Sequence, residues 1–329
     1  MIMKTAMVAG GAGFIGSHLC SSLLTEDFLV FCIDNFITGD KENIKDLLKN
    51  PNFKLIEHDI TGQNSKLIHS TSSGQISKID YIFHLASPAS PNKKSPKSYI
   101  NFPIETLLAN STGTHNLLEL TKDLSAKFLY ASSSEVYGDS LVSPQKEDYF
   151  GNVNPNGVRS VYDEGKRFGE AMTMTYFRKY KENIRIVRIF NTYGPKMRAD
   201  DGRVVSNFIN QAISNSPLTV YGDGSQTRSL CFIDDMIDGL KKAMFLETSG
   251  EVINLGNPKE QTILELASLI KEMTNSKSEI VFEELPQDDP KKRRPDISKA
   301  KRILNWTPKV DVNAGLKKTI EYFKSIKLS

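Results

Sequence analysis

The chain has 329 residues, of which 39% are hydrophobic and 25% are charged, and its formal net charge is +3 at pH 7. No apolar run reaches the roughly 20 residues that a membrane helix needs, and the net charge is too small to indicate a nucleic-acid partner. The three cysteines form no CxxC pair and the five histidines show no metal-ligand spacing, which favours a reducing compartment and no structural metal. Because a strand-like run starts at the fifth residue, we expect no signal peptide and a cytoplasmic protein.

Short apolar runs recur through the first half of the chain, at residues 5–9, 28–33, 53–57, 81–86, 127–132 and 184–190. Each run is nearly continuous rather than alternating, as in strands that are covered on both faces. Helical patterns separate several of them, for example Leu107 and Leu108 followed by Leu117 and Leu118. This alternation predicts an α/β fold with a doubly wound parallel Rossmann sheet.

The composition changes after residue 190, where glycine, proline and charged residues become frequent. We therefore predict a Rossmann domain at residues 1–190 and a smaller C-terminal lobe at residues 191–329. A further strand-like run at residues 251–256 is expected to return to the sheet, so that about residues 229–256 belong with the first domain.

A glycine-rich stretch, "GGAGFIG" at residues 10–16, follows the first predicted strand. Glycines at positions 10, 13 and 16 permit a tight turn and a close approach of backbone N–H groups to a pyrophosphate. A tight turn without any ligand is the alternative for this motif alone. Asp34, 18 residues past Gly16, strengthens the dinucleotide interpretation, because its carboxylate can accept from ribose hydroxyls. It would also repel a 2′-phosphate, which favours NAD over NADP.

The ends of the next two strands, "EHDI" and "HLASPAS", fall on the same edge of the predicted sheet. We expect adenine and ribose contacts there, although Asp59 could instead be a solvated turn residue. The predicted NAD-binding residues are Gly10, Gly13, Phe14, Ile15, Gly16, Asp34, Asn35, Asp59, Ile60, Leu85, Ala86, Ser87, Asn110, Tyr162 and Lys166.

Tyr162 and Lys166 in "VYDEGK" are four residues apart, so both lie on one face of a helix. An ammonium group beside a phenol, with a nicotinamide cation nearby, is expected to lower the tyrosine pKa from about 10. Such a tyrosine can take a proton from a sugar hydroxyl. The Tyr-x-x-x-Lys spacing is common on ordinary helices, and only its position downstream of a nucleotide motif gives it weight here.

Several longer motifs carry a resemblance that covers residues 4–323: "GGAGFIGSH", "HLASPASP", "SSSEVYGD", "NPNGVRSVYDEGKR", "RIFNTYGP", "DGRVVSNF", "VYGDGSQTR" and "DDPKKRRPDI". Together they resemble the extended short-chain dehydrogenase/reductases, the NAD-dependent epimerase/dehydratase family. Among these, the chain is most similar to the UDP-glucuronate decarboxylases, or UDP-xylose synthases. The glycine motif and the Tyr-x-x-x-Lys spacing are shared by the whole superfamily, whereas "HLASPASP", "SSSEVYGD" and "DGRVVSNF" are much narrower.

The resemblance implies a closed redox cycle on UDP-glucuronate. Tyr162 would deprotonate the C4 hydroxyl while NAD oxidises C4; the 4-ketone would then promote loss of CO2, and protonation at C5 and re-reduction would give UDP-xylose. Ser133 would bond the C4 oxygen, although the family usually has threonine there. Ser134 stands where the 4,6-dehydratases have an aspartate that helps to expel water, so dehydration is disfavoured. Glu135 resembles the family's active-site glutamate, and the three serines could alternatively be a polar strand end that caps backbone groups.

The resemblance also assigns the substrate-binding residues Asn191, Arg203, Val204, Asn207, Tyr221, Arg228 and Arg293. Arg228, which we also count among the catalytic residues, and Arg293 would clamp the anionic groups of the UDP-sugar. The run "KKRRPD" could otherwise be a solvated basic loop, and Val204 a plain core contact. A homodimer is implied by resemblance alone.

Two alternatives remain open from the residues. A nucleotide-sugar 4,6-dehydratase or UDP-hexose 4-epimerase would share Tyr162, Lys166 and the whole cofactor end. A non-enzymatic cofactor-binding regulator is disfavoured by the presence of Ser133, Tyr162 and Lys166 together.

Overall fold

A seven-stranded parallel sheet forms the centre of the computed structural model, which describes residues 3–62, 78–284 and 293–328. The strand order is β11-β6-β5-β4-β1-β2-β3, the Rossmann order with one additional strand at the β6 edge. The strands are β1 (Thr5–Ala9), β2 (Leu29–Asp34), β3 (Phe53–Glu57), β4 (Tyr81–His84), β5 (Lys127–Ser133), β6 (Ile184–Ile189) and β11 (Glu251–Leu255). The predicted doubly wound parallel sheet is confirmed.

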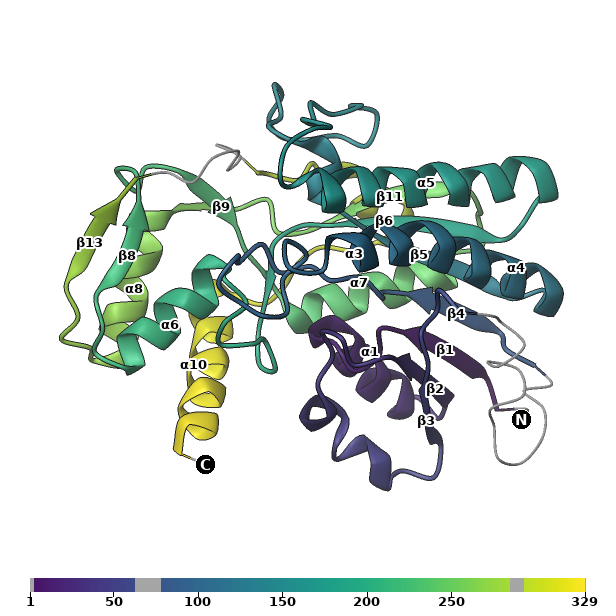
Figure 1. Ribbon diagram of the computed structural model, residues 1–329, viewed down its shortest axis with the longest axis horizontal. Helices are drawn as coiled ribbons and strands as arrows, with labels where there is room; N and C mark the ends of the chain where they lie inside the picture. The colour runs from purple at the N-terminus through teal and green to yellow at the C-terminus, as the bar shows by residue number, and fades with distance from the viewer. Residues whose placement is uncertain (1–2, 63–77, 285–292, 329) are drawn as a thin grey trace.

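Helices cover both faces of this sheet (Figure 1). On one face lie α1 (Phe14–Leu24) and α7 (Ile233–Phe245); on the other lie α3 (Pro103–Leu108), α4 (Thr114–Leu124) and α5 (Ser160–Tyr180). The strands are therefore enclosed between two apolar layers, and all five residues of β1 are buried. This double burial explains why the strand sequences are continuously apolar.

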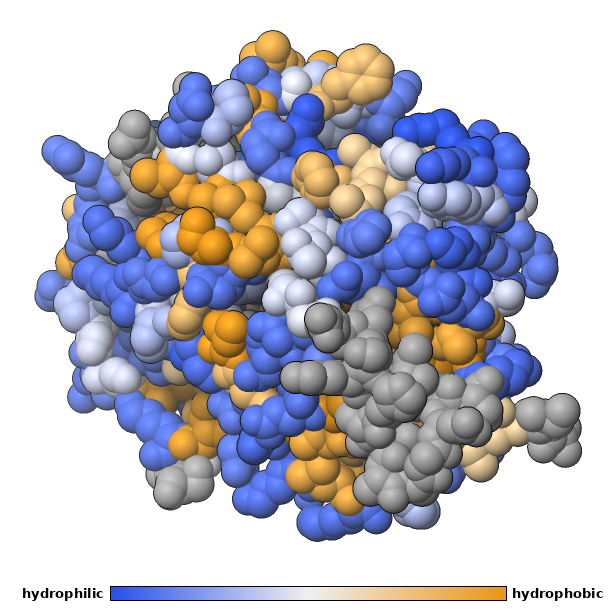
Figure 2. Space-filling view, turned by 45° about the vertical axis from the view of Figure 1, so that its right-hand side comes forward, coloured by the Kyte–Doolittle hydropathy of each residue, from blue (hydrophilic) through white to orange (hydrophobic). Residues whose placement is uncertain are grey.

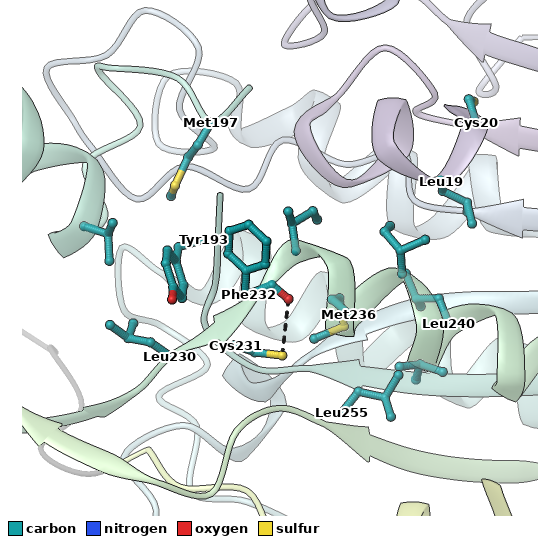
Figure 3. Close-up of a cluster of buried hydrophobic side chains, with 14 of the residues drawn as sticks. Leu19, Cys20, Tyr193, Met197, Leu230, Cys231, Phe232, Met236, Leu240 and Leu255 are labelled. Atoms are coloured by element: carbon teal, nitrogen blue, oxygen red, sulfur yellow. Dashed lines mark hydrogen bonds between the residues drawn. The ribbon is translucent and has the colours of Figure 1, made fainter. Parts of the chain in front are cut away.

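The larger apolar core lies beneath α1 and α7 and continues past the end of β6 (Figure 3). In it, Leu19 of α1 and Leu240 of α7 belong to the same cluster as Phe232 and Tyr193, which come from the second half of the chain. The sheet and the second lobe thus share one hydrophobic core. β11 pairs in parallel with β6, which brings residues 251–255 into the sheet, while the predicted domain boundaries stay a prediction.

The second lobe is built from short elements. Its helices are α6 (Val204–Ile213), α8 (Ile263–Thr274), α9 (Ser298–Leu304) and α10 (Val312–Leu328). Its strands form three pairs: β7 (Thr192–Tyr193) with β10 (Cys231–Phe232), β8 (Leu218–Tyr221) with β13 (Ile280–Glu283), and β9 (Thr227–Ser229) with β12 (Glu260–Thr262). α8 begins with a capping box in which Thr262 and Glu265 bond each other's backbone N–H groups.

The carboxyl ends of the parallel strands carry the turns that the sequence singled out. Gly10 follows β1, Asp34 ends β2, Ser133 ends β5 and Asn191 follows β6. Ligands of doubly wound folds bind at this edge. Within the described residues, no helix is long and apolar enough to cross a membrane, and the face in Figure 2 shows separate hydrophobic groups among polar residues.

Candidate active site

The glycine-rich turn after β1 leaves no room for side chains. Gly10 has φ of +80°, and a Cβ added to it would lie 2.7 Å from the backbone nitrogen of Ala86. A Cβ on Gly16 would overlap the carbonyl oxygen of Gly10, and Gly13 is the N-cap of α1. The turn therefore keeps a backbone surface free in front of the α1 N-terminus, as a pyrophosphate needs.

A cavity of about 230 Å³ opens beside this turn and is bounded by the ends of β1 to β4 and by α3. The buried carboxylate of Asp34 lines it and accepts hydrogen bonds from the backbone N–H groups of Ala12 and Phe36, both at 2.9 Å. Burial raises the pKa of Asp34, although these two N–H groups and the ammonium of Lys97 act in the opposite direction. The cavity therefore has an acceptor with fixed orientation for a ribose.

Asp59, which follows the neighbouring strand β3, lines the same cavity. Its carboxylate accepts hydrogen bonds from Asn35 at 2.9 Å and from the backbone and hydroxyl of Thr61 at 2.8 and 2.7 Å. Although burial acts to raise its pKa, these hydrogen bonds hold the pKa of Asp59 below its ordinary value. Asp59 and Asn35 form a fixed polar pair at the rim, and an adenine contact there stays a prediction.

Most of the predicted cofactor residues line this cavity, and some do not. The lining includes Gly10, Gly13, Asp34, Asn35, Asp59, Ile60, Leu85, Ala86 and Ser87. It also includes residues that the sequence did not single out: Ile33, Ile37, Thr38, Gly39, His58, Thr61, Pro88, Glu105, Leu108 and Ala109. Phe14, Ile15 and Gly16 instead belong to the start of α1, where the side chains of Phe14 and Ile15 pack against the core.

Asn110 links the cavity to the Tyr-x-x-x-Lys helix. It is fully buried in a single π-helical turn, η3 (Ala109–Gly113), between α3 and α4. Its amide donates to the Ser87 hydroxyl at 2.9 Å, and its carbonyl oxygen accepts from the Tyr130 hydroxyl at 2.8 Å. The ammonium of Lys166 lies 5.1 Å from the centre of the Tyr130 ring. π-helical turns are frequent at functional sites because they redirect one side chain.

Tyr162 and Lys166 share the inner face of α5, as their spacing predicts. Tyr162 is buried, and its ring stacks on the ring of Tyr99 with centroids 5.0 Å apart. The Lys166 ammonium lies 5.7 Å from the Tyr162 ring centre and donates to the carbonyl oxygen of Ala131 at 2.8 Å. The Ser133 hydroxyl, at the end of β5, accepts from the Glu135 N–H group at 3.3 Å and is close enough to Tyr162 to act on the pKa of its phenol. The structure thus brings the serine, tyrosine and lysine together.

The prediction that the Tyr162 pKa is lowered is wrong when only the residues of this chain act on it. Burial raises the pKa of Tyr162 to about 12, and the charge of Arg203 and the Ser133 hydroxyl only partly offset this. Burial also lowers the pKa of Lys166 to about 7, against the opposing effect of Glu170. Desolvation disfavours both charged forms and outweighs the attraction expected from the sequence.

Glu135 is held by two arginines. It lies in the short helix η4 (Ser134–Tyr137), and its carboxylate accepts from Arg159 at 2.7 Å and makes two further hydrogen bonds with Arg293. Although burial acts to raise its pKa, Arg293 and Arg159 hold the pKa of Glu135 well below its usual range. Arg293, predicted to bind a substrate anion, therefore pairs with an anion of the chain itself.

Two residues in this cluster were missed by the sequence analysis. Arg159 lies one helical turn before Tyr162, and the three-residue spacing in "RSVY" was the available signal. Asp163 is buried, and its Oδ1 has no hydrogen-bond partner among the described residues. Burial and the neighbouring charge of Glu135 raise the pKa of Asp163 to about 7.

Ser134 is almost fully buried beside Glu135. Because it is neutral, the anionic charge at this turn comes from Glu135, which the two arginines neutralise. The effect of this serine on the reaction stays a prediction.

The predicted substrate residues occupy the turns and helix that follow β6. Arg203 caps α6, donates to the carbonyl oxygen of Ala89 at 3.0 Å and lies 3.4 Å from Asp201. The charge of Arg203 acts to lower the pKa of Tyr162. Val204 packs against the core, and Asn207 donates to the Gly202 carbonyl oxygen at 3.1 Å.

Asn191 is half-buried, and its carbonyl oxygen accepts from the Cys231 N–H group at 2.9 Å. Tyr221 ends β8 with a 39% exposed side chain, and Arg228 lies on β9. Their substrate contacts stay predictions. Within the basic run "KKRRPD", Lys291 and Lys292 lie outside the described residues.

A family model for GDP-mannose 4,6 dehydratase matches residues 7–319, which is nearly the whole chain. The chain belongs to this family. The assignment confirms the predicted resemblance to NAD-dependent epimerases and dehydratases, and the chain is also similar in sequence to UDP-glucuronic acid decarboxylases. UDP-glucuronic acid decarboxylase 2 of Arabidopsis thaliana is 49% identical over 97% of this chain and 68% of the relative. UDP-glucuronic acid decarboxylase 1 of Danio rerio is 48% identical over 97% of this chain and 72% of the relative.

Two solved epimerase structures match the fold closely. UDP-glucuronic acid 4-epimerase from Bacillus cereus, in complex with UDP-glucuronic acid and NAD, superposes with a TM-score of 0.84 at 31% identity, covering 98% of this chain and 99% of the epimerase. UDP-glucose 4-epimerase from Thermotoga maritima, with UDP-glucose, gives a TM-score of 0.86 at 29% identity, again covering 98% and 99% of the two chains.

Proposed function

We propose that the chain is an NAD-dependent UDP-glucuronate decarboxylase that forms UDP-xylose. The observation that carries the proposal is that Ser133, Tyr162 and Lys166 lie together. Beside them are a neutral Ser134 and a Glu135 whose carboxylate is paired with two arginines. The near-full-length identity of 49% to a decarboxylase supports the same activity. The catalytic roles of the individual residues are part of this proposal.

The residues at the strand ends fit NAD. Side chains at Gly10 and Gly16 would collide with the backbone of Ala86 and of Gly10, so the tight turn needs glycine there, and Asp34 lines the adjoining cavity. These residues would hold the pyrophosphate and the adenosine ribose, respectively. When bound, NAD would supply a hydride acceptor at the sugar C4 and a positive ring beside Tyr162.

Tyr162 would remove the proton from the C4 hydroxyl. The Ser133 hydroxyl acts on the phenol to lower its pKa, and Tyr99 fixes the ring by stacking at 5.0 Å. Lys166 is anchored to the Ala131 carbonyl oxygen and lies on the same helix face. The phenol oxygen of Tyr162, the proposed proton acceptor, is thus held in position before the reaction starts.

The resulting 4-ketone is β to the C6 carboxylate, so the electrons of the C5–C6 bond can move into the carbonyl as CO2 leaves. Ser134 adds no negative charge beside the substrate carboxylate, and it is too weak an acid to help expel the C6 hydroxyl of a neutral hexose as water. Arg293 and Arg159 would offset the charge of Glu135 when the sugar acid approaches.

The test uses two substrates with added NAD and mass analysis of the products. With UDP-glucuronate we expect release of one CO2 per sugar and a UDP-pentose, and with dTDP-glucose no loss of water. A 4-epimerase would instead return a UDP-hexuronate of unchanged mass. Dehydration of dTDP-glucose without decarboxylation of UDP-glucuronate would refute the proposal.

Tyr162→Phe tests the proposed base. Loss of the phenol oxygen is expected to lower kcat by about 10² to 10⁴. Tyr180→Phe, at an exposed position on the same helix, is the matched control and should keep wild-type turnover. Equal rates for the two variants would contradict the role of Tyr162.

A homodimer is part of the same proposal. The outer faces of α3 and α5 carry exposed apolar side chains, with Ile104 61% and Phe168 50% exposed. Apolar faces of this kind are usually covered by a partner, and the second copy of the chain is the partner that we propose.

A further inference from the structure

The segment between β4 and α3, residues 88–101, lies between the sheet and the second lobe (Figure 1). Its first residue, Pro88, lines the dinucleotide cavity together with Ser87. Another wall of that cavity is the turn after β2, which includes Asn35, Thr38 and Gly39. The two walls follow different strands. A contact that joins them can therefore restrict the release of a molecule bound between them.

Lys97 joins these two walls. Its ammonium group reaches back from the segment and donates to the carbonyl oxygen of Gly39 at 3.0 Å. Gly39 in turn packs against Asp34 so closely that a Cβ would lie 2.6 Å from the Asp34 carboxylate. The charge of Lys97 acts on the same carboxylate. The lysine therefore holds the turn that carries the proposed ribose acceptor.

The same segment is anchored to the second lobe. Asn92 donates to the Asp200 carbonyl oxygen at 2.9 Å, and the buried Ser95 donates to the Asp200 carboxylate at 2.8 Å. The Ser95 hydroxyl also accepts from the backbone N–H of Lys97 at 3.2 Å. Arg198 fixes the same carboxylate with two hydrogen bonds of 2.9 and 2.7 Å. A continuous set of hydrogen bonds thus runs from the second lobe through Ser95 to Lys97 and Gly39.

We propose that Lys97 is a positioning residue that retains the dinucleotide, and that residues 88–101 couple this retention to occupancy of the second lobe by the UDP part of the substrate. The inference rests on the proposed function, because it takes NAD and a UDP-sugar as the ligands. It assigns to Lys97 a role that the sequence motifs do not indicate. Nucleotide binding in the second lobe would stabilise the Asp200 anchor and so slow the release of the cofactor.

The experiment measures release of NADH rather than turnover. Wild-type protein is loaded with NADH, an excess of NAD is added, and the fall in bound NADH fluorescence gives the dissociation rate, with and without UDP. We expect UDP to slow the release. In Lys97→Met, which keeps the aliphatic stem, release without UDP should be about three- to tenfold faster, as expected for the loss of one hydrogen bond of ordinary net strength.

Three variants make the test specific. Lys94→Met removes an exposed positive charge from the same segment and should behave as wild type. Lys97→Arg restores a charged donor and should recover at least part of the slow release. Ser95→Ala cuts the link to Asp200 while the Lys97 side chain remains, so it should weaken the effect of UDP more than it changes release without UDP.

Equal release rates for wild type, Lys97→Met and Lys94→Met would overturn the retention role. An undiminished UDP effect in both Lys97→Met and Ser95→Ala would overturn the coupling. If the wild-type protein binds no NADH, the proposed function itself fails, and this inference fails with it.

Discussion

Glu135 acts as a fixed anion in this site. Two arginines donate to its carboxylate, and their charges hold its pKa low despite burial. A carboxylate in this state is a poor proton donor, so any proton that the cluster holds at neutral pH resides elsewhere. Asp163, whose carboxyl oxygen lacks a partner among the described residues and whose pKa is raised to about 7, is the group that fits.

Asp163→Asn tests this distribution of charge through stability. Burial and the charge of Glu135 raise the folded pKa of Asp163 to about 7 from an ordinary value of 3.8, so the wild-type protein loses stability as pH rises from about 4 to 7. Asparagine stays neutral throughout and avoids that loss. The variant should therefore gain about 1–3 kcal/mol relative to wild type between pH 5 and pH 8, measured by urea unfolding.

Asp123→Asn on the exposed face of α4 is the control and should show no such dependence on pH. A stability difference between wild type and Asp163→Asn that is the same at both pH values would contradict the raised pKa.

At the scale of elements, the packing of α5 on β5 sets the position of Tyr162. Gly169 of α5 lies directly against the buried Tyr130 of β5, and a Cβ there would overlap the Tyr130 hydroxyl. That hydroxyl donates to Asn110. The close approach of helix and strand therefore also fixes the side chain that links the cofactor cavity to Lys166.

Two glycines of α5 provide a matched comparison. Gly169→Ala forces a Cβ into the Tyr130 ring and should destabilise the protein by about 1–3 kcal/mol. Gly165→Ala brings its Cβ only to 3.5 Å from Asn110 and should be neutral or stabilising by up to about 1 kcal/mol, because alanine favours the helix. The urea midpoints of the two variants measure the difference. Similar losses of stability in both would contradict the role of the close contact between Gly169 and Tyr130.

The strands of the sheet are predictable from the sequence because their burial on both faces leaves a local signature. The residues of β1 and β3 coincide with the predicted apolar runs, whereas the run at 81–86 extends past the end of β4 into the cavity wall. The π-helical turn at Ala109–Gly113 has no such signature, since it differs from an α-helix by one inserted residue.

The charge cluster around Glu135 illustrates what local patterns leave out. Its partners lie 24 and 158 positions away in the chain, and only the folded sheet edge brings them together. The predicted pKa of Tyr162 failed for a related reason. The Tyr-x-x-x-Lys spacing shows that a lysine lies near the tyrosine, but it does not show how deeply the tyrosine is buried. Burial has the largest effect on the pKa of Tyr162.

At the scale of the whole molecule, the proposed homodimer predicts an effect of charge on the α3 and α5 faces. Ile104→Glu places a carboxylate at the exposed apolar position on α3 and should shift the protein from dimer to monomer in sedimentation equilibrium. Leu48→Glu, at an exposed position in η2 (Leu47–Lys49), should leave the dimer intact. A wild-type protein that sediments as a monomer would refute the proposed interface.

The central claim is that CO2 leaves from a 4-ketone formed and reduced again within one active site. UDP-glucuronate carrying deuterium at C4 tests this most directly, with the product analysed by mass and NMR. The account predicts a UDP-pentose that retains deuterium at C4 and has gained a solvent proton at C5. A decarboxylated product that has lost the deuterium would contradict it. So would deuterium found only in a hexuronate that has kept its carboxylate.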